Sequence, residues 1–243
     1  MKTKQDSFFS SGLGLAFLAG IGLMVANISP TIVTAYVQNP IFSTRDAGNI
    51  ISINMLGNAL GALITSFYLQ RFNWFRATVF LLSILIVLDL FSISVTHPFL
   101  LFLVRFIYGL TAGALMGIAY AAIAQTSGPE RIQALSYTMQ LLSGGILIQL
   151  ITPQIESAGV IVVWLPLVVF SVIGLLLSPL LRKRTLAKDS FVATKNQSRA
   201  NNLIIGLGLA SLFAFQMGQF AAFAYVIELG TNHNFNIGFT GTS

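Results

Sequence analysis

Long apolar stretches, each separated from the next by a polar break, occupy most of the chain. A bilayer core about 30 Å thick is crossed by roughly 20 apolar residues in an α-helix. Stretches of this length or longer lie at 11–38, 47–70, 77–96, 98–124, 132–155, 159–181 and 202–229. Because their apolar residues run continuously, without the alternation of barrel strands, we predict seven membrane-spanning helices.

The composition agrees with a membrane location. Of the 243 residues, 55% are hydrophobic and 8% are charged, whereas about 25% of the residues of a typical soluble domain are charged. So few charges cannot cover a water-exposed surface, which excludes a soluble enzyme, a nucleic-acid-binding protein and a disordered chain. The absence of cysteine also excludes disulfides, thiolate metal sites and cysteine nucleophiles, and we expect neither a metal nor a cofactor.

The basic residues indicate how the chain is oriented. Lys and Arg accumulate in the cytoplasmic loops of membrane proteins. The chain has 13 Lys and Arg residues, and Arg105 is the one that lies within an apolar stretch. Arg45 alone lies in the breaks on the side of the membrane opposite the N-terminus. All the others lie on the side of the N-terminus, in the N-terminal segment and in the second, fourth and sixth breaks. We therefore predict a multi-pass protein of the cell (inner or plasma) membrane with a cytoplasmic N-terminus.

Two other classes of membrane protein fit the sequence poorly. Seven-helix receptors have an external N-terminus, and a retinal protein requires a lysine in its last helix, where 202–229 has none. An intramembrane serine protease requires a buried Ser–His pair, but His97 and His233 lie at the end of a span or in a loop. We therefore do not expect an enzyme.

Polar residues recur at helical spacing within several predicted spans, and such residues at membrane depth require an explanation. The first span also contains Pro30, which should kink or open the helix. One interpretation is that these polar faces join helices through hydrogen bonds; the other is that they line a shared cavity with aromatic edges. The faces comprise Asn27, Thr31, Thr34 and Gln38; Asn54, Asn58, Gly61 and Thr65; Gln133, Ser136, Gln140 and either Ser143 or Gly144; and Gln216 and Gln219 beside Phe220 and Phe223. For the second interpretation the candidate solute contacts are Asn27, Thr31, Gln140, Gln216 and Gln219.

Two charged residues, Asp89 and Arg105, lie within predicted spans, where each costs about 2.5–3.5 kcal/mol at a helix centre. Asp89 precedes His97 by as many residues as Arg105 follows it, so the two lie at similar depth on adjacent arms of a hairpin. We predict an Asp89–Arg105 ion pair. The alternative is that Arg105 faces the cavity and meets an anionic solute group or a coupling carboxylate.

Glycines recur on one face of the fourth span, at Gly109, Gly113 and Gly117, and a shorter pair, Gly57 and Gly61, lies in the second span. Small residues at this spacing allow two helices to approach closely. We predict that these residues pack helices, and that Gly57 and Gly61 belong to a moving surface between two halves of the protein.

The fourth span reads Arg105-Phe106-Ile107-Tyr108-Gly109-Leu110-Thr111-Ala112-Gly113, which is similar to the R-x-x-x-G-x-x-x-G signature of the major facilitator superfamily of transporters. Pro129-Glu130-Arg131 resembles that family's entry into the fifth helix, and Asn27-Ile28-Ser29-Pro30 resembles its first-helix N-x-x-P pattern. The family's loop signature between helices two and three is mostly absent, because only Arg71 matches it. The resemblance implies a role for Arg105 in proton coupling or solute binding.

The resemblance also implies an all-α integral membrane fold of the major facilitator type. In that layout 1–181 is a six-helix bundle, 182–201 is a basic cytoplasmic central loop, and 202–243 is the first helix of a second bundle with its following loop. Relatives contain about twelve spans in two six-helix halves, so we expect a truncated chain that needs a second half.

The expected function is secondary active transport of a small organic solute by alternating access. The sequence contains no phosphate-binding glycine loop, which leaves an ion or solute gradient as the energy source, with protons favoured over sodium. The alternative is a non-catalytic membrane assembly or receptor-like protein, in which the glycine ridges serve packing only. Membrane lipids are expected partners in both cases, and nucleic acid in neither.

Overall fold

The computed structural model describes residues 2–71 and 73–181, with side chains from residue 12 onward, and the single residues Leu207, Ser211, Gly218, Phe223 and Tyr225. The predicted loop at 182–201 and all but these few residues of the predicted seventh span lie outside the described residues. Gln216 and Gln219 are among those outside.

The secondary-structure elements of the described residues are all helices, as the apolar stretches predicted. Five of them are long and apolar enough to cross a membrane, counting only the described residues. They correspond to the second through sixth predicted spans: α4 (Thr44–Tyr68), α5 (Trp74–Ser94), α6 (Pro98–Ala124), α7 (Pro129–Ile151), which continues through η1 (Thr152–Gln154) and α8 (Ile155–Ala158), and α9 (Ile161–Leu177), which ends in η2 (Ser178–Leu181).

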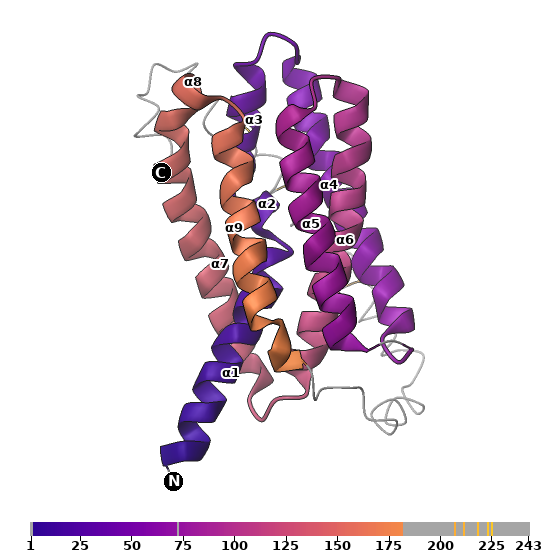
Figure 1. Ribbon diagram of the computed structural model, residues 1–243, viewed down its shortest axis with the longest axis vertical. Helices are drawn as coiled ribbons and strands as arrows, with labels where there is room; N and C mark the ends of the chain where they lie inside the picture. The colour runs from indigo at the N-terminus through magenta and orange to yellow at the C-terminus, as the bar shows by residue number, and fades with distance from the viewer. Residues whose placement is uncertain are drawn as a thin grey trace.

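The first predicted span is not one helix but three consecutive segments, α1 (Lys2–Ile21), α2 (Met24–Asn27) and α3 (Ser29–Val37). They follow one another from one end of the bundle to the other (Figure 1). Pro30 lies in the first turn of α3, where its missing N–H is tolerated but where it cannot continue a helix from α2. The hydroxyls of Thr31 and Thr34 donate to the carbonyls of Ile28 and Pro30 at 2.6 and 3.0 Å, which satisfies carbonyls around this break. The expected distortion at Pro30 is therefore a full interruption.

The helices form one bundle with their connections at two opposite ends. The α4–α5 and α6–α7 connections lie at the same end as the N-terminus, and the α3–α4 and α5–α6 connections lie at the other end (Figure 1). The most extensive contacts between helices are those of α4 with α6, α5 with α9, and α1 with α7. The pairing of α4 with α6 brings together segments that are separated by the whole of α5.

The seam between α4 and α6 consists of two glycine pairs that face each other's backbones. A Cβ atom at Gly109 or Gly113 would overlap the backbone of Asn54 or Asn58 on α4, respectively. On α4, a Cβ at Gly57 or Gly61 would overlap backbone atoms of α6. The fit is looser at Gly117, where a Cβ would lie 3.2 Å from the Thr65 side chain. Our expectation that Gly57 and Gly61 lie between two halves of the protein is wrong, because their partner α6 belongs to the same bundle.

Candidate functional site

Arg105 and Asp89 face each other across the α5–α6 contact. Arg105 Nη1 lies 3.0 Å from Asp89 Oδ1, and both side chains are fully buried. Helices α5 and α6 are antiparallel neighbours joined by a short turn at His97, so their equal distance from that turn places the two charges at one depth.

The guanidinium of Arg105 has further hydrogen-bond partners on α5. Its Nη2 donates to the Leu88 carbonyl at 3.1 Å and to the Ser92 hydroxyl. The Arg105 carbonyl accepts a hydrogen bond of 3.1 Å from the Asn54 side chain of α4. Such hydrogen bonds reduce the cost of burying an ion pair, which is high when the remaining donors are unpaired.

Two aromatic rings cover the guanidinium. Its central carbon lies 3.9 Å from the centre of the Trp164 ring on α9 and 4.7 Å from that of Tyr108 on α6. Both distances are within the range of cation–π attraction. The Trp164 Nε1 donates a hydrogen bond of 3.1 Å to the Tyr36 hydroxyl on α3. The Arg105–Asp89 pair therefore lies where α3, α5, α6 and α9 meet.

Trp164 and Tyr36 were not among the residues that the sequence indicated. Tyr108 follows Arg105 by three residues, a spacing that puts both on one helix face. No comparable signal exists for Trp164 or Tyr36, because each lies on another helix. Their contact joins residues separated by 128 positions.

The polar faces predicted on the first, second and fifth spans make hydrogen bonds between helices. Asn58 Nδ2 donates to the Gly22 carbonyl at 2.6 Å, and Ser136 Oγ donates to the Ala16 carbonyl at 3.0 Å. These bonds are made to backbone carbonyls of the interrupted first span. For Asn58 and Ser136, the interpretation as interhelical contacts therefore holds.

The structure brings together two of the predicted solute contacts, Asn27 and Gln140. Asn27 Nδ2 lies 3.4 Å from the backbone carbonyl oxygen of Gln140, and the side-chain Nε2 of Gln140 donates to the Ser136 hydroxyl at 3.0 Å. Thr31 is fully buried, and its hydroxyl donates to its own helix, at the Ile28 carbonyl. Gln216 and Gln219 lie outside the described residues.

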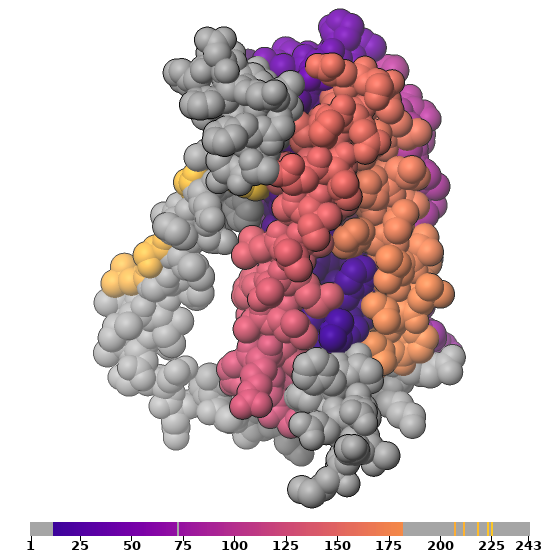
Figure 2. Space-filling model, turned by 90° about the vertical axis from the view of Figure 1, so that its left-hand side faces the viewer, coloured from indigo at the N-terminus to yellow at the C-terminus, as the bar shows by residue number. Residues whose placement is uncertain are grey.

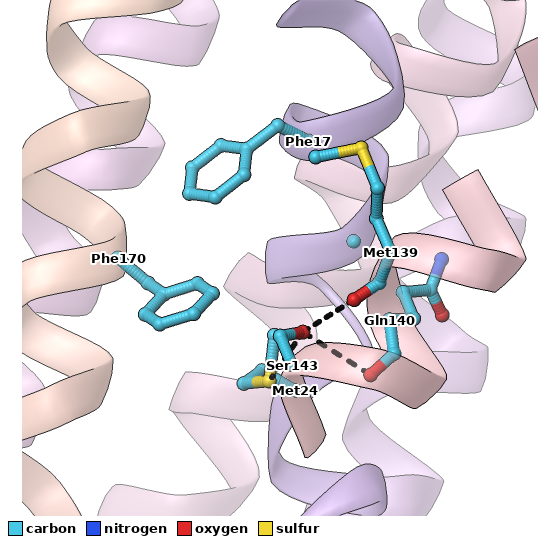
Figure 3. A pocket seen from close by; sticks show the side chains of 7 residues that line it. Phe17, Met24, Met139, Gln140, Ser143 and Phe170 are labelled. Atoms are coloured by element: carbon cyan, nitrogen blue, oxygen red, sulfur yellow. Dashed lines mark hydrogen bonds between the residues drawn. The ribbon is translucent and has the colours of Figure 1, made fainter. Parts of the chain in front are cut away.

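A cavity of about 90 Å³ lies beside Gln140, between α1, α2, α7 and α9 (Figure 3). Its lining is mostly apolar and comprises Phe17, Gly20, Met24, Met139, Gln140, Ser143 and Phe170. The rings of Phe17 and Phe170 stack with their centres 5.4 Å apart. The Gln140 amide points away from these rings (Figure 3). In Figure 2, α1 is visible between α7 and α9, which is where this region meets the surface.

The Ser143 hydroxyl is paired with its own helix. It donates to the carbonyls of Met139 and Gln140 at 2.6 and 3.1 Å. With the serine paired and the Gln140 amide turned away, the cavity suits an apolar group rather than a charged one. Among the described residues, no group of three or more His, Cys, Asp or Glu side chains is placed to hold a metal ion.

Comparison with known proteins supplies a family assignment. A family model described as "Uncharacterised MFS-type transporter YbfB" matches residues 17–231. A search of curated proteins finds no match. The matched range includes both breaks of the first span, the Arg105–Asp89 pair and the cavity beside Gln140.

Proposed function

Because the chain belongs to the MFS-type transporters, we propose that it is a secondary active transporter that moves a small organic solute by alternating access, driven by protons. The family is one of transporters and not of enzymes, and its members are multi-pass membrane proteins. Membership also disfavours the alternative in which the glycine ridges serve packing alone.

The observation that supports proton coupling is the buried Arg105–Asp89 pair. Replacing a buried ion pair by apolar residues of similar volume is often neutral or stabilising, so packing alone gives little reason to keep one. Ionisable residues inside a membrane protein are by default candidates for ion or substrate pathways. Protonation of Asp89 would remove one partner of Arg105 and weaken the contact between α5 and α6.

The proposed solute contacts are Asn27, Thr31 and Gln140, together with Gln216 and Gln219. Uncharged amides and an adjacent apolar cavity favour a small, partly apolar organic solute over a simple ion. In transporters with two bundles, the solute lies near the midplane between them. We propose this layout here, with a bundle over 1–181, a cytoplasmic loop over 182–201, and the start of a second bundle over 202–243.

We further propose a location in the cell membrane with a cytoplasmic N-terminus. The connections α4–α5 and α6–α7 lie at the N-terminal end of the bundle (Figure 1). Arg71 lies in the first of these connections, and Arg76 and Arg131 lie in the first turns of α5 and α7, which follow them. Arg45 lies at the start of α4, at the opposite end. This distribution agrees with the positive-inside rule.

The test is solute-dependent proton movement in vesicles that contain the complete gene product. The panel consists of amino acids, sugars, aromatic acids and drugs, and a pH-sensitive dye reports the protons. We expect movement with at least one solute class, and its loss in Arg105→Ala at unchanged membrane insertion. Arg45→Ala is the matched control, because Arg45 is exposed and remote from the site. No proton movement with any solute would remove the basis for proton coupling, and normal movement in Arg105→Ala would remove Arg105 from the mechanism.

A further inference from the structure

Arg105 is held by the Asp89 carboxylate, by two uncharged acceptors on α5 and by two aromatic rings, and of these partners only the carboxylate can lose its charge. Asp89 is joined to Arg105 by one hydrogen bond, between Nη1 and Oδ1. Among the described residues, no second hydrogen bond joins Asp89 Oδ2 to Arg105 Nε. The pair therefore lacks the two parallel hydrogen bonds that arginine and a carboxylate can form.

Two further partners of Arg105 are aromatic rings. The Trp164 ring lies 3.9 Å from the guanidinium carbon, closer than the Tyr108 ring at 4.7 Å. Trp164 and Arg105 are both fully buried. The face of an indole attracts a cation through a permanent quadrupole, and this attraction increases when water is excluded. Unlike a carboxylate, the ring does not change its charge when a proton arrives.

The orientation of the Trp164 ring is fixed at its edge by Tyr36. The indole N–H is a donor only, and its bond of 3.1 Å to the Tyr36 hydroxyl satisfies it in a buried position. Tyr36 is in turn held by Phe42, whose ring packs edge-on at 4.8 Å. A line of contacts therefore runs from α3 through α9 to Arg105 on α6.

We propose that Trp164 is a positioning residue that keeps Arg105 in place both when Asp89 is charged and when it is neutral, with Tyr36 setting the orientation of the indole ring. This inference rests on the proposed function in one respect, namely that Asp89 is the group that gains a proton. With Arg105 retained, protonation removes the ionic part of the contact with α5 and leaves both the hydrogen bonds to Leu88 and Ser92 and the α6–α9 side intact. Because Tyr36 belongs to the segment that also carries Thr31, a displacement of α3 would reach Arg105 through the same ring.

The fluorescence of Trp164 tests this proposal without a known solute. The chain contains two tryptophans, so Trp74→Phe leaves Trp164 as the single indole. In the purified Trp74→Phe protein, we expect Arg105→Met to shift the emission maximum, since it removes the cation from the ring. We expect Asp89→Asn, which has the shape of a neutral Asp89, to keep the emission of the parent. If Asp89→Asn shifts the emission as Arg105→Met does, Arg105 leaves the indole with the carboxylate charge, and the proposal is wrong.

A pH titration of the same parent tests this inference if Asp89→Asn fails to fold. The other titratable groups at the site are the phenols of Tyr36 and Tyr108, whose ordinary range is near pH 10. A scan from about pH 8 to about pH 3 therefore covers the ordinary range of a carboxyl group and avoids the phenols. We expect the emission to stay that of the parent throughout the scan, because Arg105 remains against the ring. The proposed coupling is tested separately, by the loss of solute-dependent proton movement in Asp89→Asn in the vesicle assay. An acidic-limit emission equal to that of Arg105→Met contradicts the role of Trp164.

The role of Tyr36 has its own readout. The ultraviolet resonance Raman bands of indole report hydrogen bonding at N–H, and Tyr36→Phe removes the acceptor while keeping the ring. We expect Tyr36→Phe to shift the Trp164 band to that of a free N–H. Tyr137→Phe, at a half-exposed position on α7, is the matched control and should leave the band unchanged. An unchanged band in Tyr36→Phe would show that Tyr36 does not orient the ring.

Discussion

The side-chain amide of Asn58 on α4 donates a hydrogen bond of 2.6 Å to the carbonyl of Gly22, at the interruption between α1 and α2. A helix break in a membrane leaves carbonyls without intrahelical partners, and these are tolerated only where another group satisfies them. Asn58 therefore stabilises the broken first span from the neighbouring helix.

Asn58→Ala is expected to lower the free energy of unfolding by about 1–3 kcal/mol, because it leaves a buried carbonyl unpaired. Denaturant or thermal unfolding in detergent micelles measures the change. Ser52→Ala is the control on the same helix: Ser52 is exposed and bonds only to its own turn, at the Gly48 carbonyl. A loss no larger than that of Ser52→Ala would mean that the Gly22 carbonyl does not depend on Asn58.

Gly113→Ala is expected to destabilise the bundle by about 1–3 kcal/mol, the usual cost of inserting an atom into a packed contact. The new Cβ would overlap the backbone of Asn58, which cannot move aside as a side chain could. Gly145→Ala introduces the same atom on α7, where nothing lies within 4 Å of it. Folded yield and unfolding midpoint distinguish the two variants. Equal behaviour of both would contradict the close approach of α4 and α6.

Removal of Asp89 alone is expected to be more harmful than removal of the whole ion pair. Asp89→Leu leaves Arg105 buried without its counter-ion, at a cost of about 3–5 kcal/mol, whereas apolar replacement of both partners is often neutral. We therefore expect the double variant Asp89→Leu/Arg105→Met to regain stability in an unfolding assay.

The same double variant separates stability from transport. If the pair serves coupling, the double variant folds but does not move protons with the solute. A double variant as unstable as Asp89→Leu would contradict the energetic pairing of the two side chains. Transport by a stable double variant would contradict their role in coupling.

The orientation of the chain can be tested by chemical labelling, because the sequence contains no cysteine and gives no background. Ile41→Cys lies in the α3–α4 connection, at a side chain that is 53% exposed, and Gln70→Cys lies in the exposed α4–α5 connection. With a cytoplasmic N-terminus, a membrane-impermeant maleimide added to intact cells should label only Ile41→Cys. Permeabilised cells are the control, in which both should react. Labelling of Gln70→Cys alone in intact cells would reverse the proposed orientation.

Several features of the described structure could be predicted from the sequence because they depend on local properties of the chain. The length of the apolar stretches predicted α4 to α9 to within a few residues, and α6 begins and ends where the stretch 98–124 does. Pro30 predicted a distortion because proline removes a backbone donor at its own position. The symmetric positions of Asp89 and Arg105 about His97 predicted their equal depth, because helix rise per residue is constant.

Other features depended on which helix faces meet, and the sequence carried no signal for them. The spacing of Gly57 and Gly61 predicted a close contact but not its partner, and we assigned it to the wrong surface. The interruption at Gly22 was not predicted either. The Gly22 carbonyl is satisfied by the Asn58 side chain of another span, and the local sequence around Gly22 does not indicate that contact.

The sequence by itself determined that this protein lies in a membrane and which segments of the chain span it. It also determined which few charged and small residues lie within those segments. These properties follow from the free-energy cost of placing polar groups in lipid, because that cost depends on the composition of each segment separately. Only the tertiary structure decided that Arg105 lies between Asp89 and the Trp164 ring, and that Tyr36 holds that ring. Those contacts depend on the rotation and packing of four helices about one another, and the periodicity of a single helix does not specify them.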